Sequence, residues 1–247
     1  MELLYLIFIG FITGTINTLA GGGSLLTLPI LIFLGLPPTV ANGTNRIAIL
    51  IQNIFGNAGY KSKGVSAYPY SLYLGISALL GAIIGAQIAI DIKGALFNKI
   101  LAVVMLLVVV FIVAKPKKLK NLPERLTGKY LWLGIIVFFF IGIYGGFIQA
   151  GTGFLILMAL TSINRFSLIK SNAAKTLVVL IYSISALTIF AYYDKVNWQY
   201  GLSLALGGAI GAWLASRWSV KKGDNLIKIF LIIIVIIMAV KLWFFDS

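Results

Sequence analysis

Two short glycine clusters interrupt the apolar sequence where a membrane-spanning helix would otherwise continue. One is Gly21–Ser24, with the sequence GGGS, and the other is Gly151–Gly153, with the sequence GTG. Glycine lets the backbone turn sharply and lets a ligand approach it closely. A helix that starts after such a turn presents unpaired amide N–H groups and the positive end of its dipole, which together favour an anion. The clusters therefore predict two helix N-termini that face a bound anion. The alternative is that the glycines only permit tight packing.

Two basic residues, Arg46 and Lys175, lie inside apolar segments. Each is about two helical turns from the start of its segment, and a cation at that depth costs ~2.5–3.5 kcal/mol on membrane-insertion scales. No acidic residue is placed to pair with them, because all six lie at segment ends or in loops: Glu2, Asp91, Glu124, Asp194, Asp224 and Asp246. We interpret a small anionic substrate as the partner of both cations. The alternative is that each reaches an interface or meets helix carbonyls.

Polar side chains that can donate hydrogen bonds to an oxyanion surround these positions. The predicted substrate-binding set comprises Asn17, Thr18, Gly21, Gly22, Gly23, Ser24, Asn42, Thr44, Asn45, Arg46, Gln149, Gly151, Thr152, Gly153, Asn172, Lys175 and Thr176. Gln52, Asn53 and Asn57 either line a path or make interhelical contacts. The sequence has no histidine and no cysteine, which removes the commonest metal ligands. We expect no catalytic residue, no metal and no cofactor.

The composition and the apolar runs indicate which helices carry these residues. Hydrophobic residues make up 60% of the 247 residues and charged residues only 11%, and apolar runs of about 20 residues span a bilayer as helices. The sequence therefore predicts an all-α polytopic membrane protein. Its net charge of +14 indicates basic cytoplasmic loops rather than nucleic-acid binding. The apolar segments lie at about 3–20, 25–36, 38–60, 68–90, 95–114, 130–149, 153–163, 168–192, 197–216 and 225–244.

The chain contains an internal repeat, with matching segments in the same order in both halves. The matches are Gly10, Gly14 and Asn17 with Gly142, Gly146 and Gln149, then 20–26 with 150–156, 41–46 with 171–176, 75–86 with 201–212, and 93–100 with 222–229. We predict a first transmembrane repeat at 1–114, a basic cytoplasmic linker at 115–129, and a second repeat at 130–247. Each repeat has a long helix, a glycine-broken short or re-entrant helix, and three further helices. The glycines at 75–86 and 201–212 are interpreted as packing positions.

The basic residues indicate how the two repeats are oriented. If each short segment returns the chain to the side it came from, fourteen Lys and Arg residues gather on one side and four on the other. If the short segments stay peripheral, the basic residues divide almost evenly. Because Lys and Arg mark the cytoplasmic side, we predict inverted repeats with both termini outside.

The stretches TINTLAGGGSLLTLP, ANGTNR and SNAAKT resemble the TauE/SafE (sulfite exporter-like) family of membrane transporters. The resemblance implies a carrier in a bacterial or archaeal inner membrane for small sulfur-containing anions such as sulfite or organosulfonates. It also implies a substrate route along Gly21–Ser24 with Pro29, Ala41–Arg46, Gly151–Gly153 and Asn172–Lys175. The second half departs from the family pattern, because Ala159 stands opposite Pro29.

The function predicted from these features is secondary transport of a small anion by alternating access. The alternative is an anion-selective channel built from the same cations. A cation or metal permease is disfavoured by the lack of embedded acids, histidine and cysteine. An enzyme or an ATP-driven pump is disfavoured because no catalytic pair and no GK[ST] loop is present. The expected partners are a small anion and the lipid bilayer, without nucleic acid, and a homodimer is left open.

Overall fold

The computed structural model describes residues 2–113 and 123–220 of the chain. Within those ranges the protein is all-helical, as the composition predicts. The helices are α1 (Glu2–Ala20), α2 (Ser24–Phe33), α3 (Pro38–Lys61), α4 (Tyr70–Ile90), α5 (Gly94–Val113), α6 (Lys129–Phe147), α7 (Thr152–Ser162), α8 (Leu168–Tyr192) and α9 (Trp198–Ser219). The apolar segment expected at 225–244 and most of the linker expected at 115–129 lie outside the described residues.

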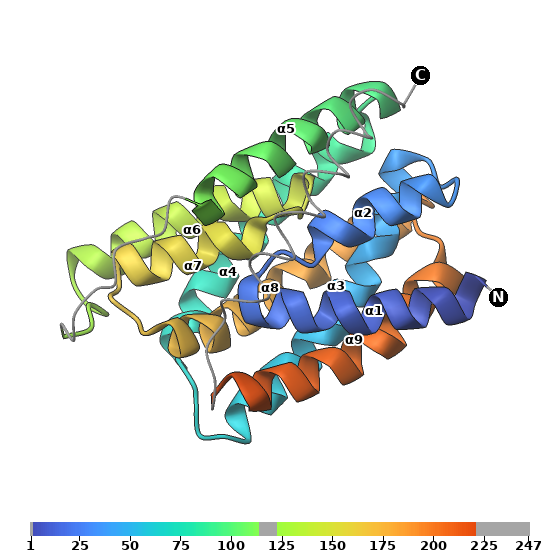
Figure 1. Ribbon diagram of the computed structural model, residues 1–247. Coiled ribbons are helices and arrows are strands. Elements are labelled where there is room, and N and C mark those ends of the chain that lie inside the picture. The colour runs from blue at the N-terminus through green and yellow to red at the C-terminus, as the bar shows by residue number, and fades with distance from the viewer. Residues whose placement is uncertain (1, 114–122, 221–247) are drawn as a thin grey trace.

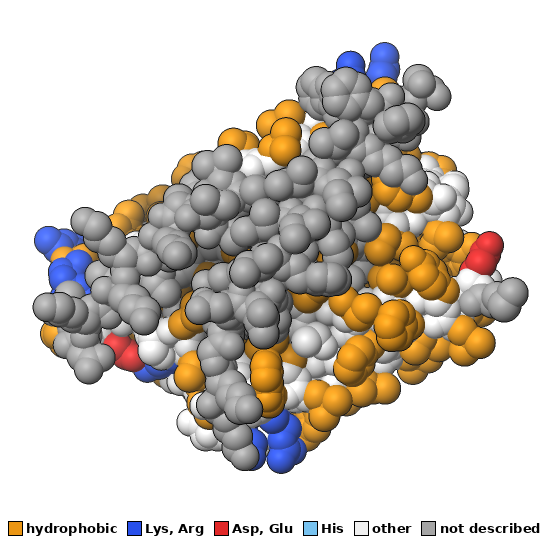
Figure 2. Space-filling view, in the orientation of Figure 1, with side chains coloured by type: hydrophobic (Ala, Val, Ile, Leu, Met, Phe, Trp, Pro, Cys, Tyr) orange, Lys and Arg blue, Asp and Glu red, His pale blue; other side chains and the backbone are white. Residues whose placement is uncertain are grey.

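Four of these helices, α1, α4, α6 and α8, are long and apolar enough to cross a membrane. The helices α2 and α7 have only 10 and 11 residues, which is too short to span a bilayer core of about 30 Å. They are the two short segments that the glycine clusters predict. Large apolar side chains such as Leu4, Phe8, Trp132 and Leu206 are exposed on the outer surface. Figure 2 shows hydrophobic side chains spread over the visible part of this surface and basic side chains near its ends. The fold is that of a membrane protein whose outer face suits lipid.

The helices of the two halves are packed against one another rather than in separate bundles (Figure 1). Helix α9 lies against α1 and α3, and α4 lies against α6 and α8, while α3 and α8 contact each other. In the repeat alignment α1 to α4 correspond in order to α6 to α9. The contact of α1 with α9 therefore corresponds to the contact of α6 with α4. Each half thus contributes its fourth helix to the packing of the other half.

Glycine makes these close contacts feasible. A β-carbon at Gly81 or Gly85 of α4 would collide with backbone atoms of α6, and one at Gly207 or Gly211 of α9 would collide with α1. The packing role predicted for the glycines at 75–86 and 201–212 is therefore confirmed at these four positions. The close approach fixes how each fourth helix sits against the broken helix of the other half.

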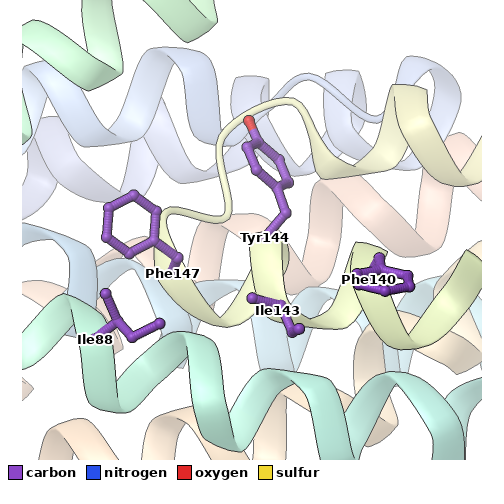
Figure 3. A pocket seen from close by; sticks show the side chains of 5 residues that line it. All are labelled: Ile88, Phe140, Ile143, Tyr144 and Phe147. Carbon is purple, nitrogen blue, oxygen red and sulfur yellow. The ribbon is translucent and has the colours of Figure 1, made fainter.

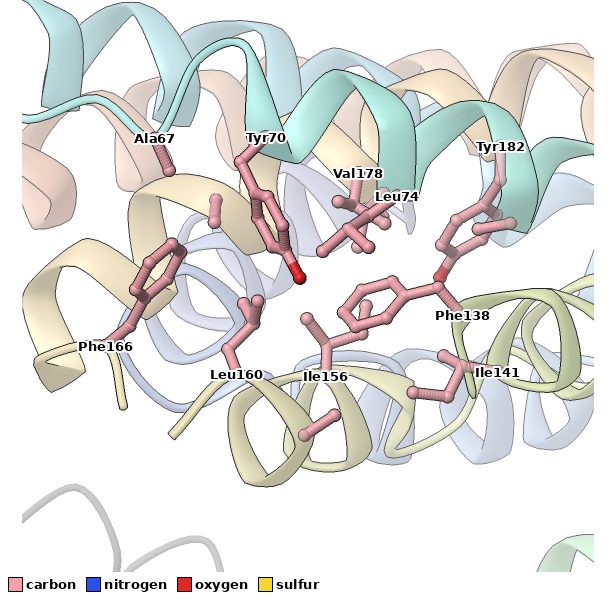
Figure 4. Packing of buried hydrophobic residues seen from close by; sticks show 14 of the residues in the cluster. Ala67, Tyr70, Leu74, Phe138, Ile141, Ile156, Leu160, Phe166, Val178 and Tyr182 are labelled. Atoms are coloured by element: carbon pink, nitrogen blue, oxygen red, sulfur yellow. The ribbon is translucent and has the colours of Figure 1, made fainter. Parts of the chain in front are cut away.

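A hydrophobic core joins α4, α6, α7 and α8. Figure 4 shows Tyr70, Phe138, Ile156 and Tyr182 of this cluster pointing toward one another. A second cluster packs Phe97, Leu101 and Met105 of α5 against α2 and the segment between α6 and α7. These two clusters hold the short helices in place within the bundle.

Candidate functional site

The two helix breaks meet at the same point of the molecule. The first separates α1, which ends at Ala20, from α2, and the second separates α6, which ends at Phe147, from α7. A β-carbon on Gly21 would lie 2.6 Å from the carbonyl carbon of Gly153, so the two breaks touch through their backbones. Figure 1 shows α2 and α7 on opposite sides of this point. Both breaks lie where the glycine clusters predict them.

Backbone conformation at the breaks requires glycine. Gly21 has φ 81° and Gly151 has φ 70°, and both angles lie in the left-handed region that L-residues with a β-carbon avoid. Gln149 also has a positive φ of 61°, which is uncommon for a residue other than glycine. The close packing suggested as the alternative role of the glycines is therefore present at Gly21 and Gly153. Ligand binding at the same glycines remains a proposal.

The start of each short helix carries unpaired amides. The amides of Leu25 and Leu26 donate to the carbonyls of Gly22 and Gly23, at 3.1 and 3.0 Å. Among the described residues, the amides of Gly22, Gly23 and Gly151 have no acceptor, and all three residues are buried. Buried N–H groups at a helix N-terminus favour an anionic ligand.

Arg46 is fully buried and holds the C-terminus of α6. Its Nη1 donates to the carbonyl of Gly145 at 3.1 Å, and its Nη2 donates to the carbonyl of Gly146 at 2.5 Å. The side chain of Asn42, one turn earlier on α3, donates to the next carbonyl, that of Phe147, at 2.7 Å. The last carbonyls of a helix have no partner within the helix, and their dipole favours a cation. Arg46 and Asn42 supply these missing donors.

Lys175 does the same for the C-terminus of α1. Its Nζ donates to the carbonyls of Asn17 and Thr18, at 2.7 and 3.1 Å, and to Oδ1 of Asn172 at 2.7 Å. Asn172 in turn donates to the carbonyl of Leu19 at 3.1 Å. Each embedded cation therefore binds the helix that precedes the break in the opposite half.

These contacts correct one premise of the sequence analysis. Arg46 and Lys175 are buried at the breaks as predicted, but the premise that they have no protein partner is wrong. Their partners are helix carbonyls, which was the alternative considered above. A separate ion pair joins Lys170 and Glu124 at the surface, at 2.6 Å between Nζ and Oε2.

The polar side chains around the second break are hydrogen-bonded to one another, and among the described residues there only Nε of Arg46 is left without a partner. Nε2 of Gln149 donates to the hydroxyl of Tyr182 at 2.9 Å, and Nη1 of Arg46 lies 3.5 Å from Oε1 of Gln149. The hydroxyl of Thr152 donates to the carbonyl of Gln149 at 2.7 Å. The ring of Phe190 lies 4.6 Å below the guanidinium of Arg46. We call Arg46, Gln149, Thr152 and Tyr182 the second-break cluster.

The polar side chains around the first break are less completely bonded. The hydroxyl of Thr27, in the first turn of α2, donates to Oδ1 of Asn45 at 2.6 Å, whereas Nδ2 of Asn45 has no partner. Oε1 of Gln52, two turns further along α3, also has none. Asn17 lies beside Gly23, since a β-carbon on Gly23 would be 2.7 Å from Cβ of Asn17. We call Asn17, Thr27, Asn45 and Gln52 the first-break cluster.

Some predicted site residues have other contacts. The hydroxyl of Thr44 accepts a hydrogen bond from the amide of Asn197 at 2.8 Å, so it fixes the loop before α9 rather than a break. Thr176 and Asn53 donate to carbonyls of their own helices, those of Ala173 and Ile49. Thr18 and Ser24 are buried next to the first break. The structure thus brings most of the predicted set together and leaves Thr44 apart.

Sequence reasoning missed three residues of the two clusters and their surroundings: Thr27, Tyr182 and Phe190. Tyr182 occupies the position of the second half that corresponds to Gln52 of the first half in the repeat. Applying the repeat to α8 could therefore have found it. No comparable signal distinguished Phe190 among the many apolar residues of its helix.

The hollow that Figure 3 shows is not a polar site. It has a volume of about 380 Å³ and is lined by Ile88 of α4 and by Phe140, Ile143, Tyr144 and Phe147 of α6. The hydroxyl of Tyr144 donates to the carbonyl of Ala150, so the tyrosine supports the second break. The remaining lining is apolar and suits lipid.

A chain with apolar spans and two broken helices that meet within the bundle has the architecture of a membrane transporter. Residues 6–242 match the family described as Sulfite exporter TauE/SafE. The chain therefore belongs to the TauE/SafE family, as the resemblance of its motifs predicted.

Relatives along nearly the whole chain support this assignment. A probable membrane transporter protein from Sinorhizobium sp., ORF9, is 27% identical over 97% of this chain and 92% of its own length. One from Haemophilus influenzae is 27% identical over 98% of this chain and 95% of its own length. The probable membrane transporter protein YfcA from Escherichia coli K12 is 28% identical over 98% and 89%, respectively. No solved structure matches the chain.

Proposed function

We propose that this protein is a secondary transporter that moves a small anion across the inner membrane by alternating access. The anion is sulfur-containing, such as sulfite or an organosulfonate, in keeping with the family description. The observation that carries the proposal is the contact of the two breaks at Gly21 and Gly153, with Arg46 and Lys175 buried beside them. Broken helices in matching positions of two halves are the best structural pointer to a transporter site.

The charge at the breaks supports an anion as the ligand. The helices α2 and α7 present the positive ends of their dipoles there, and Arg46 and Lys175 add two formal charges. The helix carbonyls that the cations bind carry only partial negative charge, about half an elementary charge for each helix end. A small anion bound at the breaks would be stabilised by the two helix N-termini and by the two basic side chains.

We further propose that the halves are inverted repeats, with both termini outside and the basic loops in the cytoplasm. The distribution of basic residues and the exchanged packing of α4 and α9 support this orientation. Because the chain has no cysteine, single cysteines can report the side of each loop without background. We expect Lys63→Cys, before α4, to react with an impermeant maleimide only from the cytoplasm, and Lys195→Cys, before α9, only from outside. Labelling of both from one side would contradict the inverted arrangement.

Transport is tested with purified protein reconstituted into liposomes. We expect liposomes preloaded with unlabelled sulfite to accumulate radiolabelled sulfite by counterflow, and acetate to compete less well. Lys175→Met and Arg46→Gln should each lower the counterflow rate at least about tenfold, because each removes a charge at the breaks. Lys170→Met removes a lysine of the same helix α8 at the surface and is the matched control, with an unchanged rate.

The outcomes separate the alternatives. Saturable counterflow supports a carrier, whereas large single-channel currents without counterflow would support an anion channel instead. If none of sulfite, sulfate, thiosulfate, sulfoacetate or acetate is transported or stabilises the purified protein against heat, the proposed anion is wrong. If anions are transported equally by wild type and both variants, the two cations have a structural role only.

A further inference from the structure

The two breaks differ in how far their polar groups satisfy one another, although their sequences are matched in the repeat. In the second-break cluster, Gln149 contacts both Arg46 and Tyr182, and Nε of Arg46 is the one buried polar side-chain atom of the cluster without a partner in the described part of the chain. In the first-break cluster, Nδ2 of Asn45 and Oε1 of Gln52 have no partner, although the two side chains are 0% and 4% exposed. A buried polar atom without a partner costs about 1–3 kcal/mol, so such atoms usually mark a ligand, a water or a functional role.

The unpaired amide of Asn45 lies at the N-terminus of α2. Its other carboxamide atom, Oδ1, accepts the hydroxyl of Thr27, and this hydroxyl is itself 3.5 Å from the carbonyl of Gly23. The carboxamide is therefore held against the first turn of α2, where the amides of Gly22 and Gly23 also have no acceptor among the described residues. Three buried donors, the amides of Gly22 and Gly23 and Nδ2 of Asn45, therefore lie at the N-terminal end of α2, a helix of 10 residues.

Lys175 binds the end of α1 that leads into this break. Its Nζ is bonded to the carbonyls of Asn17 and Thr18, and Asn17 lies directly beside Gly23. The first break therefore combines a cation, a helix N-terminus and an unpaired side-chain donor. At the second break, Gln149 holds Tyr182 and Arg46 instead of offering its donors, and the guanidinium of Arg46 is bound by helix carbonyls except at Nε.

From this difference we infer that the two breaks contribute unequally to substrate binding. The first break binds the oxyanion group of the substrate through the amides of Gly22 and Gly23 and Nδ2 of Asn45, while the second-break cluster forms a fixed wall opposite to it. This inference rests on the proposed transport of an anion and adds that the first break is where the charged oxygens bind. It makes Asn45 a binding residue that discriminates anions by their acceptor oxygens.

The test is direct binding of sodium sulfite and sodium sulfoacetate to purified full-length protein, measured by calorimetry. We expect Asn45→Ala to raise the Kd for both anions about tenfold or more, because a hydrogen bond to a charged group is lost. Asn45→Asp keeps the shape and the contact with Thr27 but replaces the donor with a negative charge, so it should abolish binding. Asn53→Ala is the matched control on the same helix, because Asn53 donates to the carbonyl of Ile49 in its own helix; its Kd should stay within about twofold.

The outcomes distinguish this inference from the proposed function. If wild type binds the anions and Asn45→Ala binds them equally well, the inference is overturned while the proposed function stands. If wild type binds neither anion, the proposed function fails and the inference fails with it. Each variant is accepted only if it elutes as a single species with an unliganded Tm close to that of wild type. If Asn45→Ala does not meet this criterion, Asn45→Asp decides, and unchanged binding by that variant overturns the inference.

Discussion

The break between α1 and α2 and the break between α6 and α7 arise from similar glycine clusters, yet they are stabilised in different ways. Before the second break, the carbonyls of Gly145 and Gly146 receive their hydrogen bonds from Arg46. Before the first break, the carbonyl of Asn17 accepts both Lys175 and the amide of Gly21, at 2.7 and 2.9 Å. A repeated sequence motif thus determines where the chain breaks, whereas the residues around it determine how each break is stabilised.

Three glycines at or near the breaks differ in backbone angle and in the space around them. Gly21 combines a positive φ with backbone contact to Gly153, whereas Gly153 contacts Gly21 without a positive φ. Gly35, which follows α2, has a positive φ of 89° and open space around it. Alanine substitutions at these three glycines therefore distinguish the cost of backbone strain from the cost of steric collision.

The largest effect is expected for Gly21→Ala. Strain of about 1–2 kcal/mol from the left-handed conformation adds to about 1–3 kcal/mol from the collision with Gly153. We expect Gly35→Ala to show only the strain and Gly153→Ala only the collision. Denaturant unfolding in detergent measures the three changes in the free energy of unfolding. If Gly35→Ala lowered the free energy of unfolding as much as Gly21→Ala, the contact between the two breaks would add no steric cost.

The two buried cations are expected to contribute unequally to stability. We expect Arg46→Leu to lower the free energy of unfolding by roughly 3 kcal/mol, because it removes the donors to two carbonyls. Lys175→Met should cost less, about 1–2 kcal/mol, because the carbonyls of Asn17 and Thr18 keep bonds from the amide of Gly21 and the hydroxyl of Tyr60. The same unfolding measurement decides the order of the two variants.

Lys170→Met is the control for the cation comparison. Its partner Glu124 is at the surface, and exposed ion pairs contribute about 0–1 kcal/mol. If Lys175→Met destabilised the protein more than Arg46→Leu, the two helix ends would not be held as the hydrogen bonds indicate.

The sequence predicted the features that depend on local chemistry. Glycine clusters inside apolar runs located both breaks, since few other residues allow the backbone angles found at Gly21 and Gly151. The depth of Arg46 and Lys175 in apolar segments predicted their burial. The internal repeat and the lengths of the apolar segments predicted an all-helical membrane protein with two short segments.

The partners of the cations could not be predicted because they come from distant parts of the chain. Arg46 binds a carbonyl 99 residues away, and Lys175 binds one 158 residues away. Only the exchanged packing of the two halves brings these groups together. The grouping of Thr44 with the site failed for a local reason. Because successive helical residues are about 100° apart, Thr44 faces the loop before α9, whereas Asn42 and Arg46 face α6.

The smallest effects are expected where the two clusters differ most directly, at the repeat-related pair Gln52 and Tyr182. Tyr182→Phe leaves Nε2 of Gln149 without its acceptor, so we expect a loss of about 1 kcal/mol. Gln52→Met removes a buried oxygen that has no partner, so the free energy of unfolding without ligand should stay unchanged or rise by about 0.5–1 kcal/mol. Only Tyr182→Phe is therefore expected to destabilise the protein, although the two variants alter matching positions. Equal destabilisation by both, measured by denaturant unfolding without added anion, would show that Gln52 is bonded as fully as Tyr182 and that the two breaks are alike.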